Sequence, residues 1–460
     1  MDIQFLGATG HVTGSCYLIR VREHRILLEC GLIQGLEEHE DRNRDPFPFD
    51  VSSIDAVVLS HAHIDHSGRL PLLKKQGFNG PIYTHEATEA LCAIMLRDAA
   101  YLQEKDAEWA NRRRRRQGQP LLEPLYTVDD AENVLDQFQG MHYHERKEIL
   151  PGISVRLCNA GHILGAAIVE LWFEEGGHQC KLVFSGDLGF VQAPVMPDPE
   201  IVTEADMVML ESTYGDRLHR DASSTLEELR AVFTSGHAGD GNIIIPAFAV
   251  GRTQDILYLM AEHFDEWHIG KYRVFLDSPM AIEATEAYSR YRNLLGTQLF
   301  RPGTTETRLE NLTMSRTSED SIAINEIDSG AIIIAGSGMC TGGRVLHHLK
   351  HNLWKRGSQV VIVGYQAHGT LGRRLVDGAE HVHLYGEDIR VNARIHTVGG
   401  LSAHADQAGL VDWYRHFEGS PRTYLVHGEP HAQTALAKLI KKETGHRPKI
   451  PRFGDRAELR

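Results

Sequence analysis

The sequence predicts an α/β protein in which a Rossmann-like parallel-sheet domain is inserted into a metal-binding α/β domain. Near the N-terminus and again over residues 153–190, short segments rich in β-formers are separated by glycine or charged turns, as in antiparallel sheets. Between residues 242 and 378, four segments each combine a strand with a following helix, which is typical of parallel sheets with helical crossovers. We therefore expect a first part over residues 1–212, an insertion over 213–388 and a C-terminal part over 389–460.

The first part should open with three antiparallel strands, in DIQFLGA, SCYLIRV and RILLECG. IDAVVLS follows as a continuous apolar run suited to a strand buried on both faces, and a helix should begin in GRLPLLKKQG. A helical, charged pattern then runs from His85 to about Arg116, ahead of a second antiparallel section. After the insertion, ARIHTVGG and RTYLVHGE are predicted strands, each followed by a helix.

The composition is that of a globular chain of 460 residues, with 42% hydrophobic and 24% charged residues. No apolar run reaches the roughly 18 to 20 residues that span a bilayer, and the N-terminus lacks an export signal. The six cysteines form no C-x-x-C pair, which indicates reduced thiols in the cytoplasm and argues against a cysteine zinc site. A formal charge of −14 lowers the expectation of a nucleic-acid binder, although a local basic groove remains compatible with it.

The stretch HAHIDHSG places four candidate metal ligands, His61, His63, Asp65 and His66, within six positions after a predicted strand. His61 and His63 are two residues apart, so an extended backbone directs both side chains the same way. Asp65 and His66 lie where the chain turns into a helix and can face a second position. The alternative, ordinary histidines in a chain that has 27, fits this crowding poorly.

Three more candidates follow predicted strands: His162 in NAGHILG, Asp187 in FSGDLG and His427 in LVHGE. By ligand chemistry, His61, His63 and His162 can hold one ion. Asp65, His66 and His427 can hold another, with Asp187 between them. Two ions roughly 3.5–4 Å apart clamp a hydroxide and stabilise attacking and leaving oxygens. The donors suit two Zn²⁺, with Mn²⁺ or Fe as competitors.

These residues resemble the metallo-β-lactamase superfamily, and further motifs resemble its β-CASP branch. That branch comprises nucleic-acid-processing nucleases, including RNase J and the nuclease subunit of the cleavage and polyadenylation machinery. The resemblance covers nearly the whole chain. It implies an αββα sandwich with an inserted β-CASP domain. The further motifs are LESTYGDR (210–217), GSGMCTGGR (336–344), GYQAHGTLGR (364–373), LSAHAD (401–406) and LVHGE (425–429).

The resemblance implies a dinuclear zinc phosphodiesterase that cleaves single-stranded RNA, with DNA as an alternative substrate, as an endonuclease. A metal-bridged hydroxide would attack phosphorus and leave a 5′-phosphate and a 3′-hydroxyl. Asp65 would take up the hydroxide proton. His404 would protonate the departing 3′-oxygen, with Glu211 orienting it. Glu29 stands where the family often has Asp, and we interpret it as a partner of a metal-bound histidine.

Two glycine-rich turns before helices are candidate phosphate cradles, because free N–H groups and the helix dipole attract anions. The residues assigned to them are Arg252, Ser337, Gly338, Gly343 and Arg344. The arginine run Arg112–Arg116 is either an RNA contact or a solvated helix end. His368 has no assigned role.

Two other functions stay open at this point. A small-molecule metallohydrolase, of thioesterase or lactonase type, shares the metal motif but leaves the insertion and His404 unexplained. A non-catalytic RNA-binding scaffold is expected to have lost metal ligands, whereas all seven are present here. A redox centre would need an electron-carrying domain, which the sequence does not suggest. The ending also resembles compact members without an additional C-terminal domain, and a homodimer is an open alternative to a monomer.

Overall fold

The computed structural model describes residues 1–35, 40–235 and 241–459, which form two compact units. Unit 1 comprises Met1–Val191, Asp198–Leu218 and His404–Arg460, and unit 2 comprises Gln192–Pro197 and His219–Ala403. The continuous part of unit 2 runs over residues 219–403, and the insertion was predicted over 213–388. The strand in ARIHTVGG, β19 (Arg394–Thr397), pairs in parallel with β16 (Gln359–Ile362) inside unit 2. The apolar pattern of ARIHTVGG predicted a strand but did not predict which sheet this strand joins.

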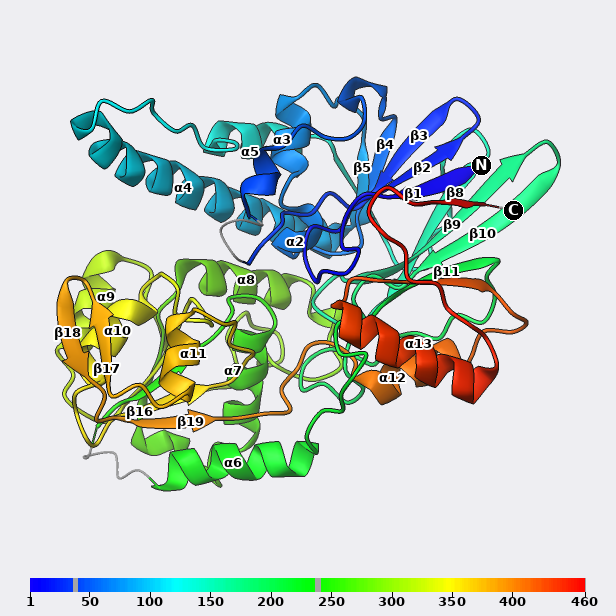
Figure 1. Ribbon diagram of the computed structural model, residues 1–460. Coiled ribbons are helices and arrows are strands. Elements are labelled where there is room, and N and C mark those ends of the chain that lie inside the picture. The colour runs from blue at the N-terminus through cyan, green and yellow to red at the C-terminus, as the bar shows by residue number, and fades with distance from the viewer. Residues whose placement is uncertain (36–39, 236–240, 460) are drawn as a thin grey trace. The chain divides into compact units, whose positions relative to one another are not determined.

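Unit 1 is built on two sheets that face each other (Figure 1). The order in the first sheet is β21 (Arg456–Glu458), β1 (Asp2–Phe5), β2 (Tyr17–Val21), β3 (His24–Leu28), β4 (Ala56–Val58), β5 (Ile82–His85) and β6 (Phe138–Met141). The order in the second is β20 (Arg422–Val426), β11 (Met207–Glu211), β10 (His178–Phe184), β9 (Ala167–Glu175), β8 (Ile153–Asn159) and β7 (Lys147–Leu150).

The core of unit 1 lies between these two sheets. Tyr17 of the first sheet packs edge-on against Phe184 of the second, with ring centroids 5.6 Å apart, and both are fully buried. Alternating residues of both sheets extend this core, because successive side chains of a strand point to opposite faces. The result is the inner pair of layers of a sandwich.

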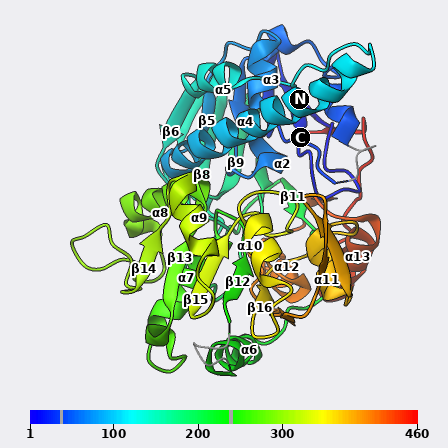
Figure 2. The same cartoon turned by 90° about the vertical axis from the view of Figure 1, so that its left-hand side faces the viewer.

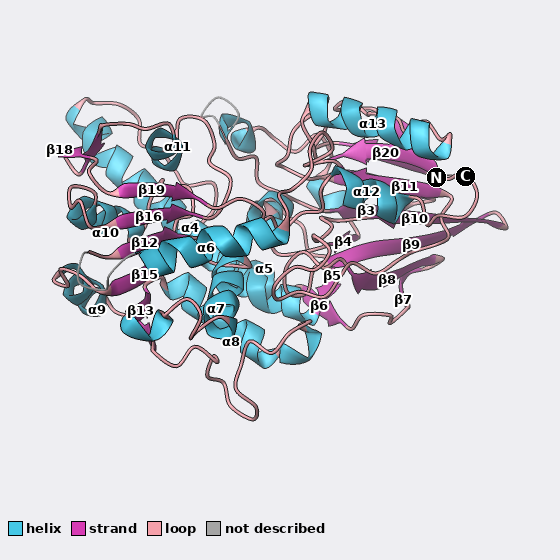
Figure 3. Cartoon of the chain, turned by 90° about the horizontal axis from the view of Figure 1, so that it is seen from below, coloured by secondary structure: helices cyan, strands magenta, loops and turns pink. Residues whose placement is uncertain are grey.

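Helices supply the outer layers of unit 1 and complete the αββα arrangement (Figure 3). α4 packs on β5 and β6 of the first sheet, and α13 packs on β20 of the second. The helices of unit 1 are α2 (Ile64–Ser67), α3 (Leu70–Lys75), α4 (Glu86–Arg116), α5 (Val128–Leu135), α12 (Gln407–Tyr414) and α13 (Pro430–Thr444).

Unit 2 is a Rossmann-like domain whose main sheet is entirely parallel, as the alternation of strands and helices predicted. The order in this sheet is β14 (Leu312–Met314), β13 (Arg273–Leu276), β15 (Ala331–Ala335), β12 (Ile243–Pro246), β16 and β19, and β17 (His381–Leu384) pairs separately with β18 (Glu387–Arg390). The helices, several of which cover the sheet in Figure 2, are α6 (Ala222–Ser235), α7 (Arg252–Glu262), α8 (Pro279–Arg290), α9 (Ser318–Asn325), α10 (Val345–Asn352) and α11 (Leu371–Val376).

Candidate active site

The histidine-rich loop follows β4 directly and turns into the single-turn helix α2. Its backbone is held by a close approach of Gly31 to the Asp65 carbonyl, where an added Cβ would lie 1.6 Å from the oxygen. Only glycine fits at that position, so the chain after β3 acts as a support for the loop. The arrangement fixes the directions of the four side chains of HAHIDHSG within unit 1.

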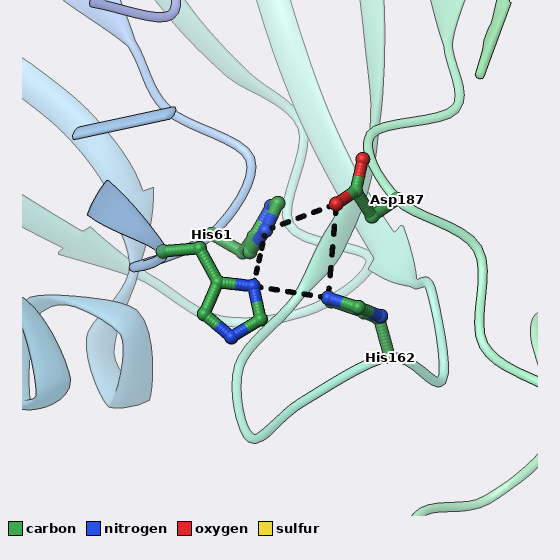
Figure 4. Close-up of side chains that lie close together, drawn as sticks. His61, His162 and Asp187 are labelled. Atoms are coloured by element: carbon green, nitrogen blue, oxygen red, sulfur yellow. Dashed lines mark hydrogen bonds and ion pairs between the residues drawn. The ribbon is translucent and has the colours of Figure 1, made fainter. Parts of the chain in front are cut away.

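One group of donors comprises His61, His63, His162 and Asp187 (Figure 4). His63 Nδ1 lies 3.2 Å from His61 Nε2 and 3.1 Å from His162 Nε2. Asp187 Oδ2 lies 3.5 Å from the His61 nitrogen and 3.7 Å from the His162 nitrogen. Residues from three separate strand ends therefore converge on one point.

A second group comprises Asp65, His66 and His427, again with Asp187 beside it. His427 Nε2 lies 3.1 Å from His66 Nε2 and 3.3 Å from Asp65 Oδ2. Asp187 Oδ2 is 3.4 Å from His66 Nε2, so the same carboxylate oxygen that faces the first group also faces the second. Asp187 thus lies between the two groups.

The spacing within both groups fits metal ions. Four ligands placed 2.0–2.1 Å from a tetrahedral Zn²⁺ lie roughly 3.4 Å from one another. Several donor pairs here are 3.1–3.8 Å apart, and all donors of a group lie within 4.8 Å of one another. Buried Asp187 Oδ1 has no hydrogen-bond partner in the described parts of the chain. A buried carboxylate oxygen normally has a partner, so a cation at this position would account for it.

Three neighbouring side chains hold the ring orientations of the candidate ligands. Glu29, fully buried, accepts a hydrogen bond from His66 Nδ1 and another from the Ser60 N–H, at 2.6 Å. Ser60 Oγ lies 3.0 Å from His61 Nδ1, and Thr213 Oγ1 lies 3.1 Å from His427 Nδ1. The sequence suggested such a role for Glu29 but not for Ser60 or Thr213. Their only signal was a position beside His61 and inside LESTYGDR.

The contact between Glu29 and His66 leads to a prediction for Glu29→Gln. An amide in place of the carboxylate makes His66 less basic, so we expect metal affinity to fall about 10–100-fold. Competition with a chromophoric chelator measures that affinity. Glu174→Gln, at an exposed position of the same unit, serves as the control. An affinity equal to that of the wild type would show that Glu29 does not act through His66.

His404 joins this cluster from the segment before α12 and lies within unit 1. Its Nδ1 is 3.2 Å from Glu211 Oε1, and Glu211 also accepts the Leu188 N–H at 2.8 Å. The chain around His404 forms a bridge with Gly189, two residues after Asp187. His404 has 20% of its side chain exposed, whereas the rings of His61, His66 and His162 are fully buried. The His404 imidazole is therefore more accessible to solvent than these three rings.

Burial and charge set the protonation of the cluster in the absence of a cation. Burial lowers the pKa of His63 to about 4, which keeps this imidazole in the neutral form that binds metals. Burial raises the pKa of Asp65, but His66 and a hydrogen bond from His427 outweigh it and lower the pKa to about 2. For His404, burial lowers the pKa, and the charges of Glu211 and Asp187 outweigh it and raise the pKa to about 9.

The predicted phosphate-binding residues lie in unit 2. The Arg344 guanidinium donates to Asp277 at 2.7 Å and to the Ser315 carbonyl at 2.9 Å. Arg252 pairs with Asp255 at 3.1 Å, and Ser337 Oγ accepts the Thr341 N–H at 2.9 Å. Both arginines thus hold unit 2 together, and the assignment of these residues, with Gly338 and Gly343, to phosphate binding stays a prediction. His368 is exposed.

Three family models match successive parts of the chain. Residues 9–146 match the metallo-beta-lactamase superfamily, residues 253–375 match the Beta-Casp domain, and residues 388–451 match the Zn-dependent metallo-hydrolase RNA specificity domain. In the parts of the chain that the structure describes, no helix is long and apolar enough to cross a membrane.

Similar proteins match over almost the full chain. Ribonuclease TTHA0252 of Thermus thermophilus is 37% identical over 99% of both chains. The transcription termination factor FttA of Thermococcus kodakarensis is 31% identical over 99% of this chain and 71% of its own. A solved structure, a protein of unknown function from Enterococcus faecalis, is 12% identical and covers 99% of both chains with a TM-score of 0.57, which reflects a shared fold.

Proposed function

Since this chain belongs to the β-CASP family of metallo-β-lactamase-fold nucleases, we propose that it is a dinuclear zinc endoribonuclease. It is a hydrolytic nuclease, and its relatives support RNA as the substrate of this metallohydrolase. The observation that carries the finer proposal is the convergence of two donor groups on Asp187, with the His404–Glu211 pair beside them.

Each donor group would bind one metal ion. His61, His63 and His162 would hold one Zn²⁺, Asp65, His66 and His427 would hold the other, and Asp187, which lies beside both groups, would be available to both. When bound, the two ions supply Lewis-acid activation of a water molecule and neutralise charge on the phosphate. Glu29, Ser60 and Thr213 keep the imidazoles oriented for this purpose. The buried surroundings strengthen each of these contacts.

The remaining chemistry is proton transfer by side chains of this chain. Water attacks phosphorus, the new P–O bond forms, and the bond to the 3′-oxygen breaks. Asp65, with 19% of its side chain exposed, accepts the proton that the water loses. His404 donates a proton to the departing 3′-oxygen, and Glu211 holds the ring through Nδ1, which leaves Nε2 as the proton donor. The products carry a 5′-phosphate and a 3′-hydroxyl.

The proposal is tested by incubating the wild-type protein with RNA labelled at one end while metal content is measured on the same sample. We expect two zinc ions per chain, internal cuts, and fragments whose 5′ ends are substrates for ligase without phosphorylation. DNA of the same sequence and simple thioesters or lactones are compared in parallel. A protein that holds two ions per chain and leaves RNA intact would overturn the proposal, and faster turnover of an ester would indicate a small-molecule hydrolase.

A further inference from the structure

The outer half of α4 extends beyond the rest of unit 1 (Figure 1). All buried residues of this 31-residue helix lie in its first half, and the last of them is Ala100. Residues 101–116 are exposed or partly exposed without exception. A helix segment without a buried face gains little from packing and needs another source of order.

The chain that returns from α4 toward α5 supplies that order on one side of the helix. Asn111 and Leu122 exchange two hydrogen bonds, of 2.9 and 2.8 Å. Glu104 accepts the Val128 N–H at 3.0 Å, and Arg114 Nε donates to the Pro120 carbonyl. The outer half of α4 and the segment that follows it are therefore held together, and this segment covers one side of the helix.

The opposite side of the helix is uncovered and has a distinctive composition. At 3.6 residues per turn, its side chains fall within about 120° of arc around the helix axis. Trp109 is 77% exposed, Tyr101 50% and Leu102 52%, so aromatic surface is freely available. We call this set the arm face; its residues are Tyr101, Leu102, Lys105, Trp109, Arg112, Arg113 and Arg116.

The charge of the arm face is opposite to that of the whole chain. The formal net charge is −14, yet in the described parts of the chain the arm-face residues Arg112, Arg113 and Arg116 form no ion pair with a carboxylate. Lys105 bridges Glu108 at 3.0 Å and lies 5.6 Å from the Tyr101 ring. Three neighbouring guanidinium groups without a carboxylate partner make the arm face a favourable surface for a polyanion.

The N-terminal end of α4 lies beside the candidate active site. Thr88 Oγ1 donates to the Gly165 carbonyl at 2.7 Å, three residues after His162. The same end of α4 packs against α2, which carries Asp65 and His66. Trp109 lies 21 residues further along the helix, or about 30 Å at 1.5 Å per residue. The helix thus runs from the metal ligands to the arm face.

We propose that the arm face binds the single-stranded RNA substrate at a distance from the scissile bond. Bases stack on Trp109 and Tyr101, and phosphates pair with Arg112, Arg113 and Arg116. Stacking on an aromatic side chain tolerates any base, so the contact favours length rather than sequence. The proposal rests on RNA being the substrate, and it predicts that a strand too short to span about 30 Å cannot reach both places.

The test compares a short RNA oligonucleotide with one several times longer. Anisotropy of labelled RNA, measured with a chelator so that the strand stays intact, gives Kd for Trp109→Ala and for the triple variant Arg112→Gln/Arg113→Gln/Arg116→Gln. We expect Trp109→Ala to raise Kd for the long RNA about tenfold and to leave the short RNA unchanged. The triple variant should reduce the slope of log K against log salt by about 2. With metal restored, kcat on the short RNA should equal that of the wild type.

The matched control is the triple variant Lys438→Gln/Lys441→Gln/Arg447→Gln, which removes the same charge from another surface of unit 1. An equal loss of long-RNA affinity in this control would mean a general charge effect and overturn the proposal, as would unchanged Kd in both arm variants. Binding of the wild type to anionic phospholipid vesicles that the arm variants lose, with RNA affinity intact, would assign the face to membranes instead. Because binding is measured without cleavage, a wild type that binds but does not cut would count against the proposed function alone.

Discussion

Replacing His66 by alanine is expected to remove one metal equivalent and to lower the rate of RNA cleavage more than about 100-fold. We expect more than 100-fold because loss of a residue that only hydrogen-bonds to a metal ligand already lowers metal affinity or activity about 10–100-fold. His66 Nε2 lies 3.1 Å from His427 Nε2 and 3.4 Å from Asp187 Oδ2, so its loss removes one donor of the second group. Metal analysis and single-turnover cleavage of labelled RNA measure both effects.

The control for this variant is His178→Ala, at the exposed start of β10 in the same unit. Because His66→Ala leaves buried Glu29 without its imidazole partner, thermal unfolding of the metal-free variant and of metal-free wild type is compared first. If folding is affected, His427→Ala provides a second removal from the same donor group. A folded variant that keeps two ions and the wild-type rate would remove His66 from the metal centre.

Replacing His404 by alanine is expected to lower kcat by about 10²–10⁴ while the metal content stays at the wild-type level. The physical reason is that His404 is held by Glu211 beside the candidate metal ligands and is more exposed than His61, His66 and His162. A residue in that place can reach a leaving oxygen without being needed to hold an ion. Glu211→Gln should lower kcat by a smaller factor, again with unchanged metal content, because the His404 ring keeps its position but loses its charged partner.

The leaving group separates proton donation from other roles of His404. A phosphodiester with a nitrophenolate leaving group departs without a proton, so His404→Ala should cleave it at nearly the wild-type rate. Steady-state kinetics on this ester and on RNA provide the comparison, with His416→Ala, on the surface after α12, as the control. An equal loss on both substrates would indicate that His404 positions substrate or metal and is not the general acid.

Much of the architecture could be predicted because the pattern of apolar residues differs between the two kinds of sheet. Continuous runs such as IIIP and AIIIA became the parallel strands β12 and β15, and the antiparallel hairpins of unit 1 fell where turns separate β-formers. The spacing of His61, His63, Asp65 and His66 indicated two directions for the ligands, and the structure places the pairs in the two groups.

Other features depend on contacts that spacing does not record. The end of the insertion depends on the pairing of β19 with β16, and the local sequence pattern does not predict that pairing. Arg344 stands at a helix start, which suggested an anion site, but its guanidinium is bonded to Asp277 and two carbonyl groups. Ser60 and Thr213 orient histidines only because the fold brings the atoms together.

The pairing of β11 with β20 has a consequence for the order of events during synthesis. β20 carries His427 into the sheet from near the C-terminus, and His404 also comes from that last segment. Chains are made from the N-terminus onward, so a chain still on the ribosome has His61, His63 and His66 before it has either of the other two. All the candidate metal ligands and His404 are therefore present together only after residue 427 has been synthesised, so the site is completed late in the making of the chain.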